Sequence, residues 1–318
     1  MDDLGTGGPR YSVIIPHHDD AQRLERLLRS IPPARADIEI IVIDDCSPDR
    51  APLEALRPRW PAVRWLSTAR NLGAGAARNV GLAHAQGAWL VFADSDDCFL
   101  PDAFAAFDAH AAAGLDLVYF LAEARQEVDG TPSIRADWLN RFLRAWLAAP
   151  SEDTLKRLAA NHVVPWAKVY AHAFIRRLDL RFEEIMFSND VAFNVLAAMQ
   201  AQQVQVVPQA VYVCTRRPNS LTANRQPQAF LSRLQTQARL AGRFKALGLE
   251  RGYLPGRSGF MMTALFEYGP ATAWAAWRIM HGSDMRPLQL HKLFNLALWY
   301  RYLRRHGRDM RERRRLLP

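Results

Sequence analysis

Short apolar runs alternate with helical patterns through the first 120 residues of this 318-residue chain, and this alternation limits the folds it can adopt. Five runs read as buried strands because they are apolar throughout or rich in β-branched residues; they are residues 11–16, 38–44, 63–67, 89–93 and 115–121. Helical spacing is clearest at 21–31 and 74–85. Continuous apolar strands separated by helices predict an α/β fold of the nucleotide-binding, Rossmann-like type, with a mostly parallel sheet flanked by helices.

The rest of the chain has a more mixed pattern. Helices are expected at 138–149, 153–160 and 190–200, an extended segment at 163–170, and two short strands within 204–215 that Pro208 separates. From about residue 228 only helical periodicity remains. We therefore predict a flexible leader at 1–9, an α/β domain at 10–225 and a helical C-terminal extension at 226–318.

Aspartates stand where three of the predicted strands end. They are Asp19 and Asp20, Asp44 and Asp45, and Asp94, Asp96 and Asp97. Ligands of an open parallel sheet bind outside the carboxyl ends of its strands. Carboxylates gathered there repel one another unless a cation joins them, and Mg2+ or Mn2+ typically binds through one or two carboxylates plus substrate phosphates. The alternative is that the aspartates only cap the following helices, a reading that suits one cluster better than three.

Ordered motifs extend over residues 11–222. They read SVIIPHHDD (12–20), IVIDDCSPD (41–49), NLGAGAARNVGL (71–82), FADSDD (92–97), PWAKVYAHAFI (165–175), FSNDVAFN (187–194) and VYVCTRRPNSLT (211–222). This ordered set resembles the family-2 glycosyltransferases. The resemblance implies a GT-A fold, a transfer that inverts the sugar linkage, a donor-binding half at 10–122 and an acceptor half at 123–225.

The resemblance also assigns roles in donor binding. Pro16 and His18 match the lining of the base pocket, and Asp45 matches a carboxylate that accepts a hydrogen bond from the uracil ring of a UDP donor. Arg78 and Asn79 match positions near the donor phosphates and ribose. His18 stands where the family usually has Tyr, so the donor base stays open.

A metal ligand is expected in the aspartate motif. Asp94 and Asp96 match the DxD pair of the family, with Asp96 as the expected ligand of Mn2+ or Mg2+ and Asp94 facing the ribose or supporting the site. Asp97 is a second candidate ligand, and the sequence leaves open which carboxylate binds. A metal ion and nearby Arg or Lys stabilise the charge of the leaving nucleoside diphosphate.

The acceptor hydroxyl must lose a proton, which calls for a carboxylate as general base. The family supplies it from an acidic pair, often Glu-Asp, before a helix, and the matching pair here is Asn189-Asp190. Asp190 is therefore the predicted base. Asn189 departs from the pattern by removing a charge, and the open alternative is that Ser188 or Asn189 caps the helix while Asp190 favours its dipole.

Other motifs point to structure more than to chemistry. Residues 73–78 partly imitate a dinucleotide fingerprint, but they are better explained by a tight turn into a helix in which glycine allows close approach of the chain. The three cysteines, Cys46, Cys98 and Cys214, are far apart and odd in number, so no disulfide framework is expected. No zinc-ligand spacing is present.

The net charge of +9 is unevenly placed, because residues 301–315 read RYLRRHGRDMRERRR. This end and the aromatic segment 274–277 favour helices that lie on an anionic membrane surface, although helices packed on the catalytic domain or on a partner protein fit equally. No apolar run is long enough to span a bilayer, and no nucleic-acid reading motif is present. We expect a cytoplasmic protein, peripheral on the inner face of the cell membrane, with no nucleic-acid partner.

The main hypothesis is a metal-dependent hexosyltransferase. It would move a sugar from a nucleotide-sugar, expected to be a UDP-sugar, to a hydroxyl of a glycan or lipid-linked acceptor in envelope polysaccharide biosynthesis. The alternative is a non-catalytic binding or scaffold protein of GT-A fold in a polysaccharide-assembly complex, which Asn189 and the long helical end favour. A nucleotidyltransferase would be expected to carry a Gly-rich basic loop after its first strand, where this chain has PHHDD.

Overall fold

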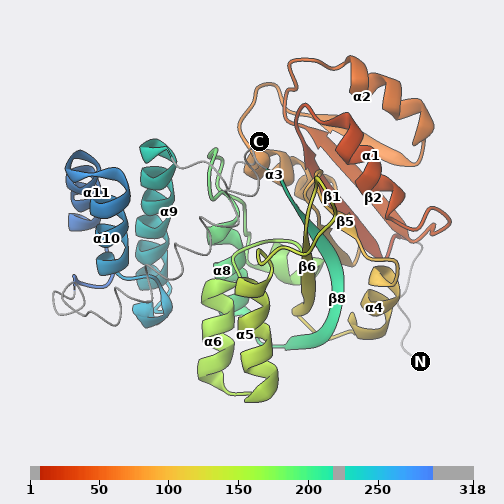
Figure 1. The fold of residues 1–318 in the computed structure, drawn as a ribbon. Coiled ribbons are helices and arrows are strands. Elements are labelled where there is room, and N and C mark those ends of the chain that lie inside the picture. The colour runs from red at the N-terminus through yellow and green to blue at the C-terminus, as the bar shows by residue number, and fades with distance from the viewer. Residues whose placement is uncertain (1–7, 218–225, 289–318) are drawn as a thin grey trace. The chain divides into compact units, whose positions relative to one another are not determined.

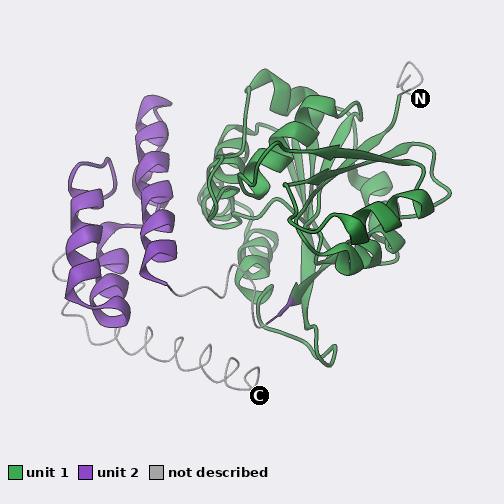
Figure 2. Cartoon of the chain, turned by 90° about the horizontal axis from the view of Figure 1, so that it is seen from above, with its two compact units in different colours: residues 1–215 green, residues 216–318 purple. Residues whose placement is uncertain are grey.

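The computed structural model divides the chain into two compact units, residues 1–215 and 216–318, and describes residues 8–217 and 226–288 (Figure 2). Most of the predicted leader and the whole basic segment 301–315 lie outside the described residues. The predicted domain boundary after residue 225 adjoins the undescribed stretch 218–225, so that boundary and the two halves at 10–122 and 123–225 stay predictions.

Four parallel strands form the first half of the central sheet (Figure 1). In spatial order they are β3 (Val63–Ser67), β2 (Ile38–Asp44), β1 (Tyr11–His17) and β4 (Trp89–Phe92). The predicted bounds of these strands are confirmed to within one residue. β1 and β4 are buried throughout and β2 along its second half, as expected of apolar strands covered on both faces, whereas β3 is only partly covered.

Antiparallel strands complete the sheet. In spatial order they are β7 (Lys168–Ala171), β6 (Leu117–Gln126), β8 (Val204–Arg216) and β5 (Cys98–Phe99). β7 runs antiparallel to both β4 and β6, and β5 runs antiparallel to β8. The α/β fold class is confirmed, and the parallel arrangement belongs to the first four strands.

The prediction of two short strands broken at Pro208 is wrong. β8 is one strand of 13 residues, and Pro208 is exposed within it. Its neighbour β5 pairs only with Tyr212 and Val213, so within residues 8–217 and 226–288 no strand pairs with β8 on that side at Pro208. An edge is where a strand tolerates proline, because no neighbour needs the missing N–H.

Helices cover both faces of the sheet (Figure 1). One face carries α1 (Ala21–Arg29), α2 (Ala51–Leu56) with the short 3-10 turn η1 (Arg57–Arg59), and α4 (Ala103–His110). The other carries α3 (Ala74–His84), α5 (Asp137–Ala148), α6 (Glu152–Asn161), α7 (His172–Arg177) and α8 (Val191–Gln200). Successive side chains of a strand point to opposite faces, so Val13 and Ile15 join the first cluster while Ile14 joins the second.

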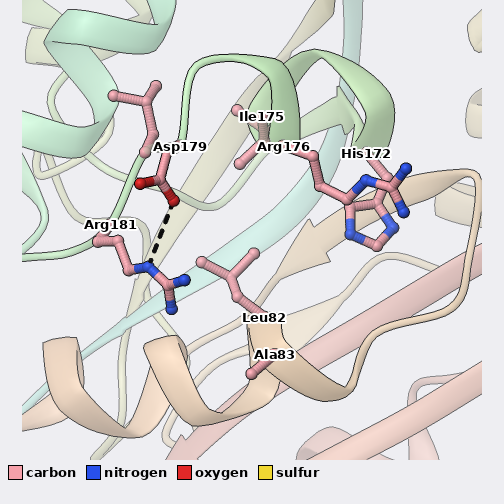
Figure 3. A pocket seen from close by; sticks show the side chains of 8 residues that line it. Leu82, Ala83, His172, Ile175, Arg176, Asp179 and Arg181 are labelled. Carbon is pink, nitrogen blue, oxygen red and sulfur yellow. Dashed lines mark ion pairs between the residues drawn. The ribbon is translucent and has the colours of Figure 1, made fainter.

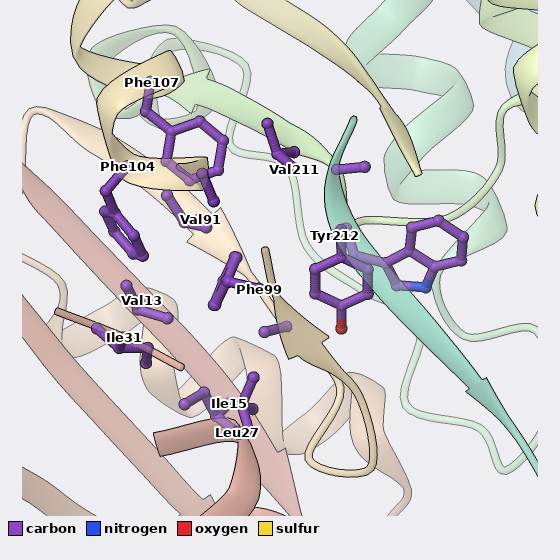
Figure 4. Packing of buried hydrophobic residues seen from close by; sticks show 14 of the residues in the cluster. Val13, Ile15, Leu27, Ile31, Val91, Phe99, Phe104, Phe107, Val211 and Tyr212 are labelled. Atoms are coloured by element: carbon purple, nitrogen blue, oxygen red, sulfur yellow. The ribbon is translucent and has the colours of Figure 1, made fainter. Parts of the chain in front are cut away.

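Aromatic packing holds β5 and β8 against the parallel half (Figure 4). The ring of Phe99 lies 5.2 Å from that of Phe104 and 5.5 Å from that of Tyr212, while Trp166 stacks on Tyr212 at 5.2 Å. Burying one such ring contributes about 2 to 3 kcal/mol. This packing fixes the place of the Tyr212 side chain beside the end of β4.

The second unit is helical in its described part. It contains α9 (Pro227–Ala246), the 3-10 turn η3 (Arg251–Tyr253), α10 (Arg257–Tyr268) and α11 (Pro270–His281). The ring of Phe230 on α9 stacks on Tyr268 of α10 at 4.9 Å. The predicted helical extension is confirmed in these described residues, and its remainder, 289–318, lies outside them. Within the described part, none of the helices combines the length and apolarity that crossing a bilayer requires.

Candidate active site

The aspartate clusters meet at one edge of the sheet. Strands β2 and β4 flank β1 and run parallel to it, so their carboxyl ends lie side by side. His17, at the end of β1, pairs in register with Asp44 at the end of β2. The predicted gathering of acidic residues at this edge is confirmed.

Asp45 follows β2 and is buried. Its Oδ1 accepts hydrogen bonds from the Thr68 hydroxyl at 2.8 Å and the Leu72 amide at 3.1 Å, and its Oδ2 accepts one from the Gly73 amide at 2.7 Å. Asp45 therefore shapes the loop that leads into α3. Each carboxylate oxygen has two lone pairs, so Oδ2 keeps one acceptor position for a further donor such as a nucleotide base.

His18 lies next to this loop and is exposed, whereas Pro16 is buried inside β1. The His18 ring is held on both sides, with Nδ1 3.0 Å from the Asp45 carbonyl oxygen and Nε2 3.2 Å from the Asn71 amide nitrogen. Cys46, the next residue after Asp45, has a left-handed backbone with φ 56°. Such a backbone favours glycine, so Cys46 adopts here a conformation that is uncommon for a residue with a side chain.

Arg78 connects two distant parts of the site. It is buried on α3, and its Nη2 donates to Asp94 Oδ1 at 2.6 Å while its Nη1 donates to Asn189 Oδ1 at 2.9 Å. The guanidinium also lies 5.3 Å from the centre of the Phe182 ring. The Arg78 side chain is buried while that of Asp94 is 31% exposed, and charge-assisted hydrogen bonds of this kind are stronger than neutral ones. Arg78 thereby holds the end of β4 beside the segment that precedes α8.

The same segment packs directly on the start of α3. Asn79 pairs with the backbone of Phe182, accepting from its N–H at 2.9 Å and donating to its carbonyl at 3.0 Å. A Cβ added to Gly75 would lie 2.1 Å from the Glu183 carbonyl oxygen, so only glycine allows this approach. The expected close approach at the glycine turn is confirmed, and Asn79 holds the segment through both polar atoms of its side chain.

Asp94 and Asp97 are held by β8. The Asp94 amide donates to the Tyr212 hydroxyl at 2.9 Å, and Asp97 Oδ1 accepts from the Thr215 amide at 2.7 Å. Burial, followed by the negative charges of Asp96 and Asp94, raises the pKa of Asp97 well above its ordinary value. The cluster therefore carries more negative charge than its surroundings compensate.

A divalent cation fits this cluster chemically. Carboxylate oxygens are hard ligands, and a cation relieves the repulsion that burdens Asp97. Among residues 8–217 and 226–288, no three His, Cys, Asp or Glu side chains form a ready-made metal cage. An ion completed by substrate phosphates needs only one or two carboxylates. Half-buried Arg135, which the sequence did not single out, also interacts electrostatically with Asp94, Asp96 and Asp97.

Asp190 lies just before α8, next to buried Asn189. Burial is the main cause that raises the pKa of Asp190 to about 6, while Arg78 lowers it and Asp94 raises it further. It stands at the N-cap position of α8, where its charge favours the helix dipole, but its side chain makes no capping hydrogen bond to the helix. A carboxyl that titrates near neutral pH suits a general base.

A separate pocket lies at the opposite end of α3 (Figure 3). Leu82 and Ala83 line it together with His172 and Arg176 of α7. The His172 ring is 2.9 Å from the carbonyl oxygen of Gly87, just before β4 begins. This pocket is therefore at the amino end of the parallel strands and contains none of the predicted site residues.

The thiols of Cys46, Cys98 and Cys214 are all free, as the sequence predicts. Burial raises the pKa of Cys98 and Cys214, which disfavours the reactive thiolate. They contribute packing volume to the site's surroundings.

Comparison with protein families and curated proteins places the site in a known context. Residues 12–164 match the family described as Glycosyl transferase family 2. An uncharacterized glycosyltransferase, EpsJ of Bacillus subtilis, is 28% identical over 239 residues, covering 72% of this chain and 67% of EpsJ. The succinoglycan biosynthesis protein ExoO of Rhizobium meliloti is 26% identical over 226 residues, covering 67% of this chain and 63% of ExoO. The chain thus spans about two thirds of the length of these relatives.

Solved structures agree on the fold. Staphylococcus aureus TarS 1–349 in complex with UDP-GlcNAc is similar with a TM-score of 0.54 and 20% identity, over 86% of this chain and 90% of that one. The mannosyltransferase PcManGT from Pyrobaculum calidifontis, in complex with GDP-Man and Mn2+, has a TM-score of 0.52 and 18% identity, over 86% of this chain and 74% of that one. These likenesses identify the GT-A fold.

Proposed function

We propose that this chain, whose residues 12–164 match glycosyl transferase family 2 and which has the GT-A fold, is an inverting, metal-dependent glycosyltransferase. One observation supports this most: buried Arg78 joins Asp94 of the aspartate cluster to Asn189, the neighbour of Asp190. The aspartate cluster after β4, where the donor phosphates are proposed to bind, and Asp190, whose pKa is about 6, are thereby brought into one site. A non-catalytic scaffold has no need of this arrangement.

Asp190 is proposed as the general base. In its ionised form it takes the proton of the acceptor hydroxyl as the oxygen forms its bond to the anomeric carbon of the donor sugar. The bond from that carbon to the nucleoside diphosphate breaks, and its electron pair leaves with the phosphate oxygen. Attack from the side opposite the leaving group inverts the sugar linkage.

The donor is proposed to be a UDP-sugar. Pro16 and His18 lie at the same edge as Asp45, whose remaining lone pair suits an N–H of a pyrimidine ring. Binding of UDP-GlcNAc by the structural neighbour TarS supports this class of donor. Arg78 and Asn79 are proposed to shape the phosphate and ribose end of the site.

Asp96 and Asp97 are proposed to hold Mn2+ or Mg2+, with Asp94 supporting them. When bound, the ion neutralises charge on the diphosphate and so makes it a better leaving group. The Mn2+ found with the structural neighbour PcManGT is consistent with this choice. Arg135 faces the same carboxylates and is suited to contact phosphate oxygens once the ion compensates them.

The acceptor is proposed to be a hydroxyl of a glycan or lipid-linked glycan in envelope polysaccharide biosynthesis. The enzyme is proposed to act at the cytoplasmic face of the membrane. The succinoglycan protein ExoO and the poly(ribitol-phosphate) enzyme TarS are relatives with such acceptors or products in their names.

The rings of Trp274 and Trp277 on α11 stack at 4.9 Å and are 61% and 40% exposed. Paired exposed Trp rings next to Arg278 suit the headgroup layer of a membrane.

A screen of nucleotide sugars for turnover with Mn2+ tests this proposal. We expect release of a nucleoside diphosphate from a UDP-sugar, abolished in Asp96→Ala and reduced at least about a hundredfold in kcat for transfer in Asp190→Asn. Asp179→Asn is the matched control, since Asp179 is 88% exposed and lies at the opposite end of α3. Full activity of Asp190→Asn would mean that another residue is the base.

A further inference from the structure

The amino group of Lys168 is buried under α8 and has no role in the chemistry described so far. Lys168 begins β7 and is 1% exposed. Its Nζ donates to the His162 carbonyl oxygen at 2.7 Å and to Asn194 Oδ1 at 3.0 Å. The rings of Tyr119 and Tyr170 lie 4.9 and 5.9 Å from the nitrogen. Full burial of a lysine is rare because it disfavours the charged form.

Asn194 links this lysine to the proposed base. It is fully buried on the first turn of α8, and its Oδ1 accepts from both Lys168 and the Tyr170 hydroxyl, the latter at 2.6 Å. Two donors on one side fix the orientation of the amide, so Nδ2 points away from them. There it donates to the Asp190 carbonyl oxygen at 2.8 Å, which also accepts from the Asn194 amide at 3.0 Å.

We propose that Lys168 is a positioning residue of the transfer reaction, which fixes the first turn of α8 through Asn194 and favours the charged form of the Asp190 carboxyl. This rests on the proposed role of Asp190 as base. The wide separation in sequence matters, because β7 is anchored in the sheet by β4 and β6 while α8 carries the base. The buried hydrogen bonds from Lys168 to Asn194 and from Asn194 to the Asp190 carbonyl oxygen thereby hold Asp190 in a fixed position relative to the sheet.

The charged groups around Asp190 come from three elements. Arg78 of α3 and Lys168 of β7 lower its pKa, and Asp94 after β4 raises it. Lys168 in turn is surrounded by His162, Tyr119 and Tyr170. Burial is the main cause that holds the pKa of Lys168 well below its ordinary value, and the Asp190 carboxylate opposes that shift. Lys168 and Asp190 thus each favour the charged form of the other.

Removal of the Lys168 amine should shift the pKa of Asp190 upward. The ionised form of Asp190 loses a favourable neighbour, so its pKa rises above about 6 and the base stays protonated over a wider pH range. A side chain that only filled space would change the stability of the protein without moving this pKa.

The test follows the Asp190 carboxyl by NMR in the full chain with isotope-labelled aspartate, and Asp190→Asn identifies its resonance. Lys168→Met removes the amine and keeps an unbranched apolar side chain. We expect it to raise the Asp190 pKa by about one unit and to lower kcat roughly tenfold near pH 6 with donor KM unchanged. Tyr170→Phe is the control, since it removes one donor to Asn194 without removing a charge and leaves the pKa in place.

Lys168→Gln covers the case in which Lys168→Met does not fold. Glutamine keeps an N–H for Asn194 but no charge, so it must give the same upward pKa shift with a smaller loss of kcat. An unchanged Asp190 pKa in either folded variant overturns the proposal. The NMR titration needs no turnover, so failure of the unaltered chain to use any nucleotide sugar would count against the proposed function alone.

Discussion

At the scale of single residues, the site depends on how charges are shared around Arg78. Its guanidinium contacts one carboxylate, that of Asp94, and one neutral amide, that of Asn189. The related motif has a second carboxylate at the latter position. Because Asn189 is neutral, it compensates less of the positive charge of Arg78 than a carboxylate would. Arg78 therefore lowers the pKa of Asp190 more, and the proposed base stays ionised at lower pH.

Asn189→Glu tests this distribution of charge. The added carboxylate pairs with Arg78 and repels ionised Asp190, so the Asp190 pKa is expected to rise above about 6, by roughly half to one unit. Since the base acts only when ionised, the acid limb of the kcat profile should move to higher pH by the same amount. Asn189→Gln, which adds length without charge, should leave the limb in place. A limb that moves equally in both variants would assign the effect to size.

The sequence identified the residues proposed to contact ligands better than the residues that support them. Asp45, Arg78 and Asp190 stand in motifs, and all three lie at the predicted edge of the sheet. Lys168 and Asn194 also stand in motifs, but the sequence assigns neither a role, because burial of a lysine depends on which elements pack over it. Their hydrogen bond spans 26 positions of the chain, a separation that no local pattern reveals.

At the scale of elements, the start of α3 and the segment before α8 behave as one structure. Gly73 has a left-handed backbone with φ 87°, and Gly75 lies against the Glu183 carbonyl. Asn79 and Arg78 then bond to the same segment. Because Asp190 ends that segment, the glycine turn sets the distance between the donor edge and the proposed base.

Gly75→Ala should separate these two elements. The added Cβ meets backbone atoms that cannot rotate away, so we expect a loss of stability of about 2 kcal/mol and a fall in kcat that exceeds any change in donor affinity. Gly259→Ala on α10 is the matched control, since a Cβ there meets nothing within 4 Å, and it should stabilise its helix by up to about 1 kcal/mol. Equal melting temperatures for both variants would contradict the close approach.

Elements of the parallel half could be predicted because their strands are short runs rich in apolar and β-branched residues that alternate with helical patterns. The antiparallel half could not, since the pairing of β7 with β4 and β6 joins segments that are far apart in sequence. β8 shows the limit most clearly, because Pro208 reads as a break unless one knows that, among the described residues, no strand pairs with β8 on one side there.

At the scale of the whole molecule, the two units divide the proposed tasks. The first unit contains every residue assigned to donor, metal and base, while the second presents Trp274 and Trp277. Helical periodicity in the sequence alone predicted the helical nature of the second unit. The spacing of Trp274 and Trp277 makes them neighbours on one helix face, but their exposure depends on how the helices of this unit pack and could not be predicted.

Vesicle binding tests the task of the second unit. The full chain should cosediment with anionic phosphatidylglycerol vesicles more than with neutral ones, and Trp274→Ser with Trp277→Ser should weaken this binding roughly tenfold or more. Nucleotide binding should stay unchanged. Val128→Ser is the control, because Val128 is a 78% exposed apolar residue of the first unit. Undiminished vesicle binding by the double variant would exclude the tryptophan pair as the contact.

The central claim is that the aspartate cluster at the end of β4 binds a nucleotide-sugar donor through a divalent cation. Calorimetric titration of the full chain with UDP, with Mn2+ present or removed by chelation, measures this directly. The account predicts binding that weakens at least about tenfold without Mn2+ and equally in Asp96→Ala with Mn2+ present. Binding of UDP that is the same with and without the metal, or no binding at all by the unaltered chain, would contradict it.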